Sequence, residues 1–313
     1  MHNATSLLRT VVVALLAAAP LAAEAQGFSL GDAANYAVLY EGSGGHNLQI
    51  NSAPLNGVSI FGNVGLGDEN GGDPQAQLNN PAVIDGNVNF AGAVNNHSNA
   101  VIHGTINGNV GAVESDLNYL NTLSSTLGGE AGTSLSINLS GSSGSQTINA
   151  SSGVLDSSGD RVFDLTSMTF NNGNTLFING DAGGDSVVVN ISSTNVNNPH
   201  FAGAMTLEGG LTPNKVLFNL IGGNSVMLTG GDTLQTSANN AFQYATYLDP
   251  TGAINMNSVN IMGHVFGGDS SDMQIVSGAT IAIPEPATEA TLTGLAVLMA
   301  AAVRRRRMLK ASH

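Results

Sequence analysis

Short apolar runs alternate with polar residues and end in Gly, Asn, Asp or Ser through most of the chain. Clear examples are residues 58–61, 174–178, 186–191 and 215–220. Such alternation places successive side chains on opposite faces of an extended strand, and the flanking residues favour turns. The pattern therefore predicts an all-β protein built from many short strands.

A weak repeat lies within this pattern. Four segments share the form apolar-x-Gly-polar-apolar, namely IFGNV at 60–64, IDGNV at 84–88, IHGTI at 102–106 and IMGHV at 261–265. The first three begin 24 and 18 residues apart. Periods of roughly 20 residues with a glycine turn in each unit favour a β-solenoid, in which successive rungs stack their apolar residues. The irregular spacing leaves a β-sandwich with similar turns as the alternative.

Two segments differ from the strand pattern. Residues 113–127 carry apolar side chains at helical spacing, and Gly128 with Gly129 can end such a helix. The apolar positions are Val113, Leu117, Leu120, Leu123 and Leu127. We therefore predict one amphipathic helix packed along the β body. Residues 134–158 are rich in Ser and Gly and predict a loop or a weakly paired edge strand.

The first residues have the order of a secretory signal. Arg9 precedes an apolar run at 11–19, and Ala23 and Ala25 form a small-residue cleavage site. The apolar run is too short for a stable membrane span. We expect signal peptidase to cut before Gln26, so that residues 1–25 are a signal peptide.

The last thirty residues also have three ordered parts. Pro284, Glu285 and Pro286 come first, and the prolines stop a helix from extending backwards. An apolar stretch at 290–303 follows, compatible with a single transmembrane-type helix of marginal length. The basic cluster that closes the tail consists of Arg304, Arg305, Arg306 and Arg307. These arginines would stay on the cytoplasmic side, which places residues 26–283 outside the cytoplasmic membrane.

This tail resembles the PEP-CTERM sorting signal, in which a Pro-Glu-Pro motif, an apolar helix and an arginine cluster follow one another. The matching segments are 284–288, 290–303 and 304–307. The resemblance implies a Gram-negative bacterium, transient anchoring in the inner membrane, and an exosortase-type membrane protease that cuts near the motif. The protein would then reach the cell surface or the extracellular polymer matrix. A plain single-pass anchor is the alternative, and it also implies export.

The exported part has a second resemblance, carried by shorter motifs. Residues 30–39, the Ile-x-Gly-Asn-Val units, the single helix, and residues 162–165, 216–220 and 259–265 follow one another in an order similar to the choice-of-anchor A family of exported bacterial proteins. More distantly they resemble β-solenoid ice-binding proteins. The resemblance implies a right-handed β-helix with an α-helix beside it, and it establishes no molecular activity.

The charge distribution limits the partners of the exported part. Residues 26–283 contain two basic residues, Arg161 and Lys215, against 19 acidic ones, a formal charge of −17. Such a surface repels nucleic acid, because nucleic-acid binding depends on cationic contacts. The chain has no cysteine, which excludes disulfides and thiol catalysis. It also has no tryptophan.

No catalytic signature is present among the common motifs, since the chain lacks both G-x-S-x-G and H-E-x-x-H. The histidines of the exported part are scattered without metal-ligand spacing. Among the Asp-Gly clusters, the carboxylates of Asp68, Glu69 and Asp73 could offer oxygens to Ca²⁺, although Asp and Gly are also what turns use. We predict no other cofactor.

These observations favour a non-enzymatic surface or matrix protein that acts in adhesion or biofilm structure through extracellular polysaccharide. A polysaccharide-active enzyme is one alternative, because a solenoid can carry paired carboxylates on one face. An ice-binding module is another, although threonine is not arrayed at a fixed rung position.

Overall fold

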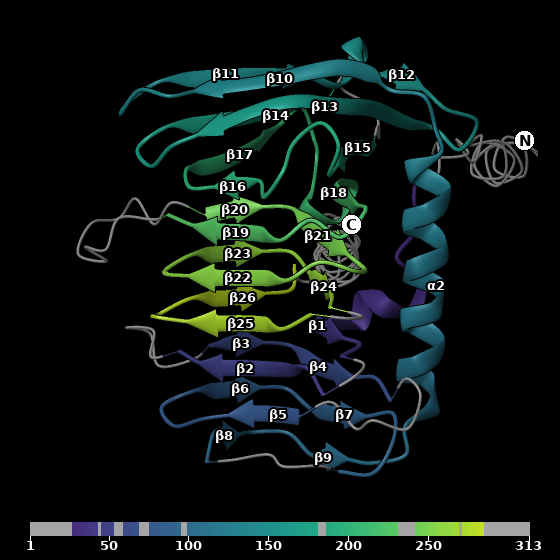
Figure 1. Cartoon of the computed structure of the whole chain (residues 1–313), viewed down its shortest axis with the longest axis vertical. Helices are drawn as coiled ribbons and strands as arrows, with labels where there is room; N and C mark the ends of the chain where they lie inside the picture. The colour runs from purple at the N-terminus through teal and green to yellow at the C-terminus, as the bar shows by residue number, and fades with distance from the viewer. Residues whose placement is uncertain are drawn as a thin grey trace, which may run out of the picture.

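The computed structural model describes residues 27–42, 45–52, 59–68, 75–94, 99–180, 186–230, 242–268 and 271–284. In these residues, short strands stack as rungs into long sheets, and an α-helix, α2 (Gly111–Gly128), lies along one side (Figure 1). Three short 3₁₀ helices, η1 (Gly31–Asn35), η3 (Ala150–Ser152) and η4 (Pro213–Lys215), lie in the connections.

The strands form four sheets, which we name A to D and give in spatial order. Sheet A consists of β10 (Thr133–Leu139), β13 (Asp160–Phe170), β15 (Ser186–Ser192), β18 (Val216–Ile221), β21 (Thr246–Asp249), β24 (Val265–Gly267), β1 (Tyr36–Tyr40), β4 (Asn63–Leu66), β7 (Val88–Phe90) and β9 (Ile106–Asn107), with β12 (Val154–Leu155) beside β13. Sheet B consists of β16 (His200–Phe201), β19 (Val226–Thr229), β22 (Ile254–Asn257), β25 (Met273–Val276), β2 (Asn47–Asn51) and β5 (Gln75–Leu78). Sheet C consists of β20 (Phe242–Tyr244), β23 (Asn260–Met262), β26 (Thr280–Ala282), β3 (Ile60–Phe61), β6 (Val83–Asp85) and β8 (Val101–Ile102). Sheet D consists of β11 (Ser145–Asn149), β14 (Thr175–Asn179) and β17 (Ala204–Glu208).

Parallel pairing dominates all four sheets. Among the described residues only β12 pairs antiparallel, and it does so with β13. Every other pair is parallel. A β-sandwich is built from antiparallel sheets, so the sandwich alternative is wrong. The stacked parallel rungs agree with the predicted solenoid, while its right-handed sense stays a prediction.

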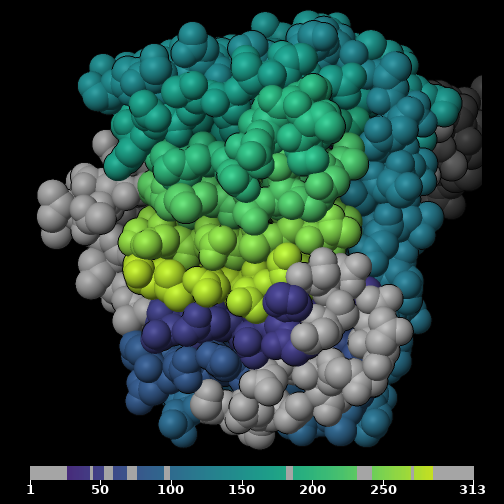
Figure 2. Space-filling model, in the orientation of Figure 1, coloured from purple at the N-terminus to yellow at the C-terminus, as the bar shows by residue number. Residues whose placement is uncertain are grey.

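The order of the rungs differs from the order of the chain. The first described strand, β1, lies in the middle of the stack, and from there the chain builds rungs down to β9 and crosses the length of the stack through α2 (Figure 1). It restarts at the far end with β10 and returns until β24, β25 and β26 pair with β1, β2 and β3. We call these three strand pairs the seam. In Figure 2 the purple N-terminal residues lie between the yellow C-terminal strands and the blue rungs.

The repeat units form neighbouring rungs. The isoleucines that open the units pair in register from Ile60 to Ile84 and from Ile84 to Ile102, and all three point toward the interior. Ile261 of the fourth unit joins the same row through Ile281, which pairs with both Ile261 and Ile60. The weak sequence repeat therefore corresponds to one continuous row of the core, even though its fourth member is far away in sequence.

In three of the four units, the polar residue bonds to the backbone of a neighbouring rung. The side-chain oxygen of Asn63 accepts from the Asn87 amide at 2.9 Å, and that of Asn87 accepts from the Thr105 amide at 2.9 Å. In the fourth unit, Nδ1 of His264 lies 2.7 Å from the carbonyl oxygen of Tyr36. These contacts satisfy backbone groups at the corners, where sheet hydrogen bonds end.

The central strands of sheet A, from β15 to β1, are buried on both faces. Their interior side chains belong to the solenoid core, while Val188, Leu217, Leu248 and Phe266 pack against α2. This double burial explains the nearly continuous apolar runs of β15 and β18. Of the five predicted apolar helix positions, Val113, Leu117, Leu120 and Leu127 are buried and Leu123 is partly buried against the same cluster. The predicted amphipathic helix is confirmed.

A buried polar network fixes the last turns of α2 to sheet A. Nδ2 of Asn219 donates to the carbonyl oxygen of Ser124 at 3.0 Å and to Oδ1 of Asn190 at 2.9 Å. Nδ2 of Asn190 in turn donates to the carbonyl oxygen of Leu127 at 2.8 Å. Since all of these groups are buried, the network sets the position of the helix as well as satisfying its C-terminal carbonyls.

The Ser/Gly-rich residues 134–158 are not a loop. They contribute most of β10 and all of β11, which occupy one end of sheets A and D. The segment lies at an edge, as the second alternative predicted, but it is not weakly paired, since β10 pairs with β13 at seven positions. The low apolar content fits an end position, because only one neighbouring rung covers these strands.

No helix in the part of the chain that the structure describes is long and apolar enough to cross a membrane. The predicted transmembrane-type segment at 290–303 and the signal peptide at 1–25 lie outside the described residues. The last strand, β26, ends at Ala282, two residues before Pro284.

Candidate functional site: the amide face of sheet B

Four carboxamide side chains form one row on the outer surface of sheet B. Asn255 pairs with Gln274, Gln274 with Gln49, and Gln49 with Gln77, so the row crosses the seam. Neighbouring strands in a sheet lie about 4.8 Å apart, which sets the spacing of these amides. We call this row, Asn255–Gln274–Gln49–Gln77, the amide face.

The local sequence explains why these amides point outward. In each strand the residues on either side of the amide are apolar and buried, as in Leu48-Gln49-Ile50 and Met273-Gln274-Ile275. Because side chains alternate along a strand, two buried neighbours place the residue between them on the surface. Packing of the buried residues fixes the strand register, and this register also aligns the amides.

The amide face is extended at one end and flanked by a second row. Met227, which is 47% exposed, and His200 continue the amide row. The second row consists of Thr229, Asn257, Val276 and Asn51. Neither row contains a carboxylate, lysine or arginine, in a domain whose formal charge is −17.

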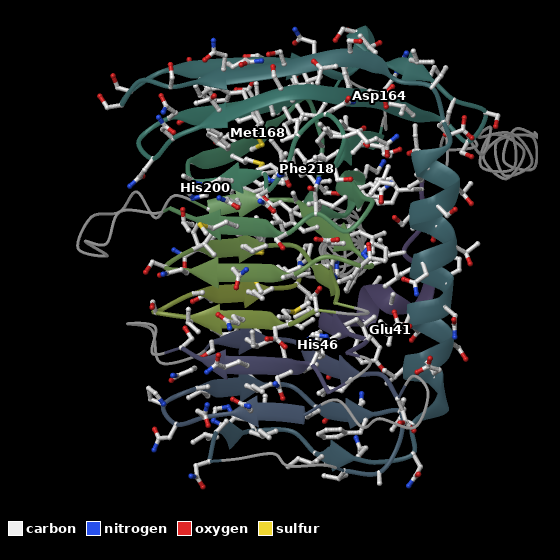
Figure 3. The ribbon with its side chains drawn as sticks, viewed as in Figure 1. Glu41, His46, Asp164, Met168, His200 and Phe218 are labelled. Atoms are coloured by element: carbon white, nitrogen blue, oxygen red, sulfur yellow. The ribbon has the colours of Figure 1, made fainter. Side chains whose placement is uncertain are left out.

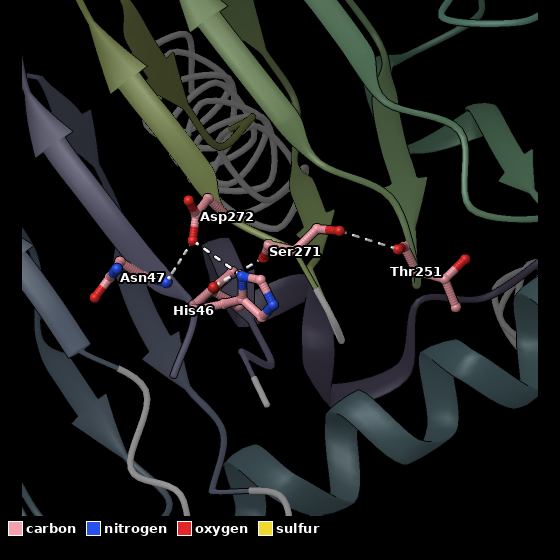
Figure 4. Close-up of polar contacts among 6 residues, drawn as sticks. His46, Asn47, Thr251, Ser271 and Asp272 are labelled. Atoms are coloured by element: carbon pink, nitrogen blue, oxygen red, sulfur yellow. Dashed lines mark hydrogen bonds and ion pairs between the residues drawn. The ribbon is translucent and has the colours of Figure 1, made fainter. Parts of the chain in front are cut away.

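The histidines near this face have structural partners. Nε2 of His200 lies 2.6 Å from Oγ1 of Thr229, and burial lowers the pKa of His200 (Figure 3). At the corner before β2, Oδ1 of Asp272 accepts from the Asn47 amide at 2.9 Å and lies 3.3 Å from Nδ1 of His46 (Figure 4). This corner ties β25 to β2 across the seam.

Two cavities lie on other parts of the described surface. One of about 600 Å³ is bordered by sheets C and D and includes Leu207, Phe242, Tyr244, Met262 and Pro284. The second, of about 410 Å³, lies beside the start of the described chain. Its lining residues are Gly27, Phe28, Ser29, Leu30, Gly31, Ala34, Ser186, Thr212, Asn214 and Lys215. Neither lining includes a carboxylate, so neither offers the carboxylate pair that glycoside hydrolysis uses.

The predicted calcium ligands are only partly described. Asp68 follows β4, and its amide donates to Oε2 of Glu114 at 3.1 Å. Glu69 and Asp73 lie outside the described residues, so Ca²⁺ binding there stays a prediction. Within the described ranges, no group of three or more His, Asp or Glu side chains could hold a metal ion.

The sorting and cleavage residues fall mostly beyond the described ranges. Pro284 is described and lines the larger cavity. The remaining predicted residues, Glu285, Pro286, Arg304, Arg305, Arg306, Arg307, Ala23 and Ala25, lie outside. The amide face, in contrast, was absent from the sequence predictions. Its signal was the recurring pattern of an amide between two apolar residues.

Comparison with solved structures finds similar proteins, whereas no family model and no curated protein matches the chain. An ice-binding protein from the Antarctic ascomycete Antarctomyces psychrotrophicus has a TM-score of 0.48 and 15% identity, covering 83% of this chain and 100% of its own. An ice-binding protein from an Arctic yeast has a TM-score of 0.44 and 15% identity, with coverages of 83% and 96%. A domain of an ice-binding protein from Shewanella frigidimarina has a TM-score of 0.44 and 10% identity, with coverages of 83% and 98%.

Two buried ionisable groups near the seam have opposite pKa shifts. Burial raises the pKa of Asp249 to about 7, and the amides of Gly252 and Thr251 offset part of that rise. Burial lowers the pKa of His264 to about 4, despite its contact with the Tyr36 carbonyl. The folded state therefore favours the neutral form of both groups.

These shifts make stability respond to pH in opposite directions. As pH rises from 4 to 7, unfolded chains release the Asp249 proton that the folded state retains, so the Asp249 contribution falls. As pH falls from 6.5 to 4, unfolded chains protonate His264 before the folded state does, so the His264 contribution falls too. Between pH 4 and 6.5 the two effects oppose one another.

Replacing Asp249 should expose the histidine effect. In Asp249→Asn, the free energy of unfolding should rise with pH between 4 and 6.5. The size of this change across the window should differ from that of the parent by about 1–3 kcal/mol. Urea unfolding at pH 4.5, 5.5 and 6.5 measures this. Glu208→Gln, at an exposed position at the end of β17, is the control and should keep the parent profile. A parent-like profile in Asp249→Asn would contradict the assignment.

Proposed function

We propose that this chain is an exported, non-enzymatic binding module whose amide face binds hydroxyl-rich extracellular polysaccharide. The observation that carries the proposal is the in-register row of Asn255, Gln274, Gln49 and Gln77. Each carboxamide offers both a donor and an acceptor, and a sugar hydroxyl has the same dual capacity. A row of such groups suits a repeating polymer better than a single small ligand.

The charge pattern supports this choice of ligand. The domain repels other polyanions through its 19 acidic residues, yet both outward rows of sheet B are uncharged. A neutral or weakly charged polymer could therefore approach this face without the desolvation of a fixed charge. The regular spacing allows several weak contacts to add, which is how an adhesive surface gains strength.

Export and sorting form the second part of the proposal. The N-terminal signal, cut before Gln26, would carry the chain out of the cytoplasm, and the tail at 284–313 would be processed by an exosortase. The end of β26 at Ala282 supports this boundary, because the tail then starts directly after the last rung. The mature domain would act at the surface or in the matrix of a Gram-negative bacterium, in adhesion or biofilm structure.

Ice binding is the second candidate for the same face. Its support is the regular array of uncharged donors and acceptors, since sheet B keeps its register from β19 to β5 without a bulge. These two rows contain one threonine, Thr229, and three of the four side chains of the amide face are glutamines. This composition favours the polysaccharide, and the experiment below separates the two ligands.

The test compares residues 26–313 with the triple variant Gln49→Ala/Gln77→Ala/Gln274→Ala. Binding is measured on a glycan panel and on the exopolysaccharide of the host. Loss of three hydrogen-bonding side chains should weaken binding at least about tenfold. Thermal hysteresis is measured on the same two proteins.

The matched control is Thr147→Ala/Thr206→Ala, which removes outward side chains of one row on sheet D. It should bind like the parent. Equal binding by the triple variant would refute the role of the amide face, and hysteresis without glycan binding would select the ice-binding candidate instead.

A further inference from the structure

The start of the described chain is attached to sheet A at one buried carboxylate. The Phe28 amide donates to Oδ1 of Asp160 at 2.8 Å, and the Ser186 hydroxyl donates to the same oxygen. Gly27 lies so close that a Cβ atom there would stand 1.5 Å from Oγ of Ser186 and 2.6 Å from Oδ1 of Asp160. The first described residues are therefore held against β13 and β15.

The second oxygen of this carboxylate has no partner among the described residues. Asp160 is fully buried, and its Oδ2 atom is inaccessible and makes no hydrogen bond there. A buried acceptor without a donor destabilises a fold, and a buried carboxylate does so more strongly. The site therefore needs a cation or a donor that the described residues do not supply.

The charged groups around Asp160 increase this need. Burial raises the pKa of Asp160, the hydrogen bonds from Ser186 and Phe28 offset part of that rise, and the charges of Asp156 and Glu130 add to it. Arg161 follows Asp160 on the same strand, and alternation directs it to the opposite face. Lys215 lines the neighbouring cavity of about 410 Å³, together with Gly27 and Ser186. The cavity reaches Ser186, whose hydroxyl donates to the carboxylate.

We propose that Asp160 and Ser186 form a binding site for a primary ammonium group, and that its occupant is the α-ammonium of the mature chain. Cleavage before Gln26 would create this charge one residue before Gly27, a step of about 3.8 Å along the chain. Before cleavage, the same nitrogen is a neutral amide. Removal of the signal peptide would thus complete the buried ion pair.

The site rests on the predicted cleavage position and is independent of the amide face. An α-amino group has a pKa near 7.7–8.0 in an unfolded chain, and the partner carboxylate raises it in the folded state. Its contribution to stability is therefore present below about pH 8, as long as Asp160 is ionised, and is lost as the pH rises through the raised folded value.

The first experiment compares chains of residues 26–313 that differ only at the N-terminus. One begins with a free Gln26, one carries an N-acetyl group on Gln26, and one retains Ala25 as an extra first residue. At pH 7 the free chain should unfold about 2–4 °C above the other two. The difference should disappear in Asp160→Asn, which removes the negative charge. Equal Tm values, or a difference that persists in Asp160→Asn, would overturn the proposal.

A second measurement needs no substitution. The free α-amine of an N-terminal glutamine attacks the carbon of its own side-chain amide, forms a C–N bond and releases ammonia. An ammonium paired with Asp160 cannot attack, so Gln26 should cyclise at least about tenfold more slowly in the folded chain than in urea at the same pH. Equal rates, or a first residue other than Gln26 in the exported protein by mass spectrometry, would also overturn it.

Discussion

Gly86→Ala should lower the free energy of unfolding by about 3 kcal/mol or more. A Cβ atom at residue 86 would lie 2.2 Å from the carbonyl oxygen and 2.4 Å from the carbonyl carbon of Gly62 in the next rung. Both contacts are with backbone, which cannot move without breaking the ladder on either side. Gly104 repeats the geometry one rung further, with its own Cβ position 2.4 Å from the Gly86 oxygen.

Urea unfolding measures this effect through the midpoint at constant slope. Gly141→Ala is the matched control, because no atom lies within 4 Å of a Cβ built there. It should change stability by less than about 0.5 kcal/mol. If Gly86→Ala and Gly141→Ala had similar midpoints, close stacking at the glycine corners would not be what the repeat requires.

Phe218→Ala should cost about 3–5 kcal/mol, the usual range for removing a buried aromatic ring. Phe218 is fully buried in the solenoid interior (Figure 3). Its ring centroid lies 5.0 Å from that of Phe201 in an edge-on arrangement and 5.5 Å from that of Tyr247 in a stacked one. The substitution therefore removes two aromatic contacts and leaves a cavity between successive rungs.

Thermal and urea unfolding of Phe218→Ala should be compared with Met227→Ala, which truncates a side chain that is 47% exposed. Met227→Ala should remain within about 0.5 kcal/mol of the parent. Phe218→Leu should fall between the two, because leucine fills part of the cavity. A loss below about 1 kcal/mol in Phe218→Ala would mean that the rungs collapse around the missing ring.

The sequence predicts the local structure of this protein well. The glycine repeat indicates stacked rungs, since Ile60, Ile84 and Ile102 occupy one row. The spacing of Val113 to Leu127 predicts the helix and its buried side. Both signals are local, with a period that backbone geometry imposes. The Ser/Gly-rich segment was ambiguous because strands at an end of the stack need few apolar residues.

The arrangement of the rungs was not predictable in the same way. Nothing in the local pattern of β1 or β24 says that residues 36–40 and 265–267 are neighbours. The amide face depends on that pairing, because Gln49 and Gln274 come from opposite sides of the seam. Its residues were visible as amides between apolar neighbours, yet their alignment requires the register of strands that are far apart in sequence.

The seam also determines when the chain can complete its fold, if it is exported as proposed. If the chain crosses the membrane from its N-terminus, β1, β2 and β3 emerge long before β24, β25 and β26, which are their partners on one side. Until residue 282 is outside, the first rungs keep an open strand edge, and open edges invite pairing with other chains. Under the proposed export, the domain can close only when translocation is almost finished, just before the proposed sorting motif that begins at Pro284.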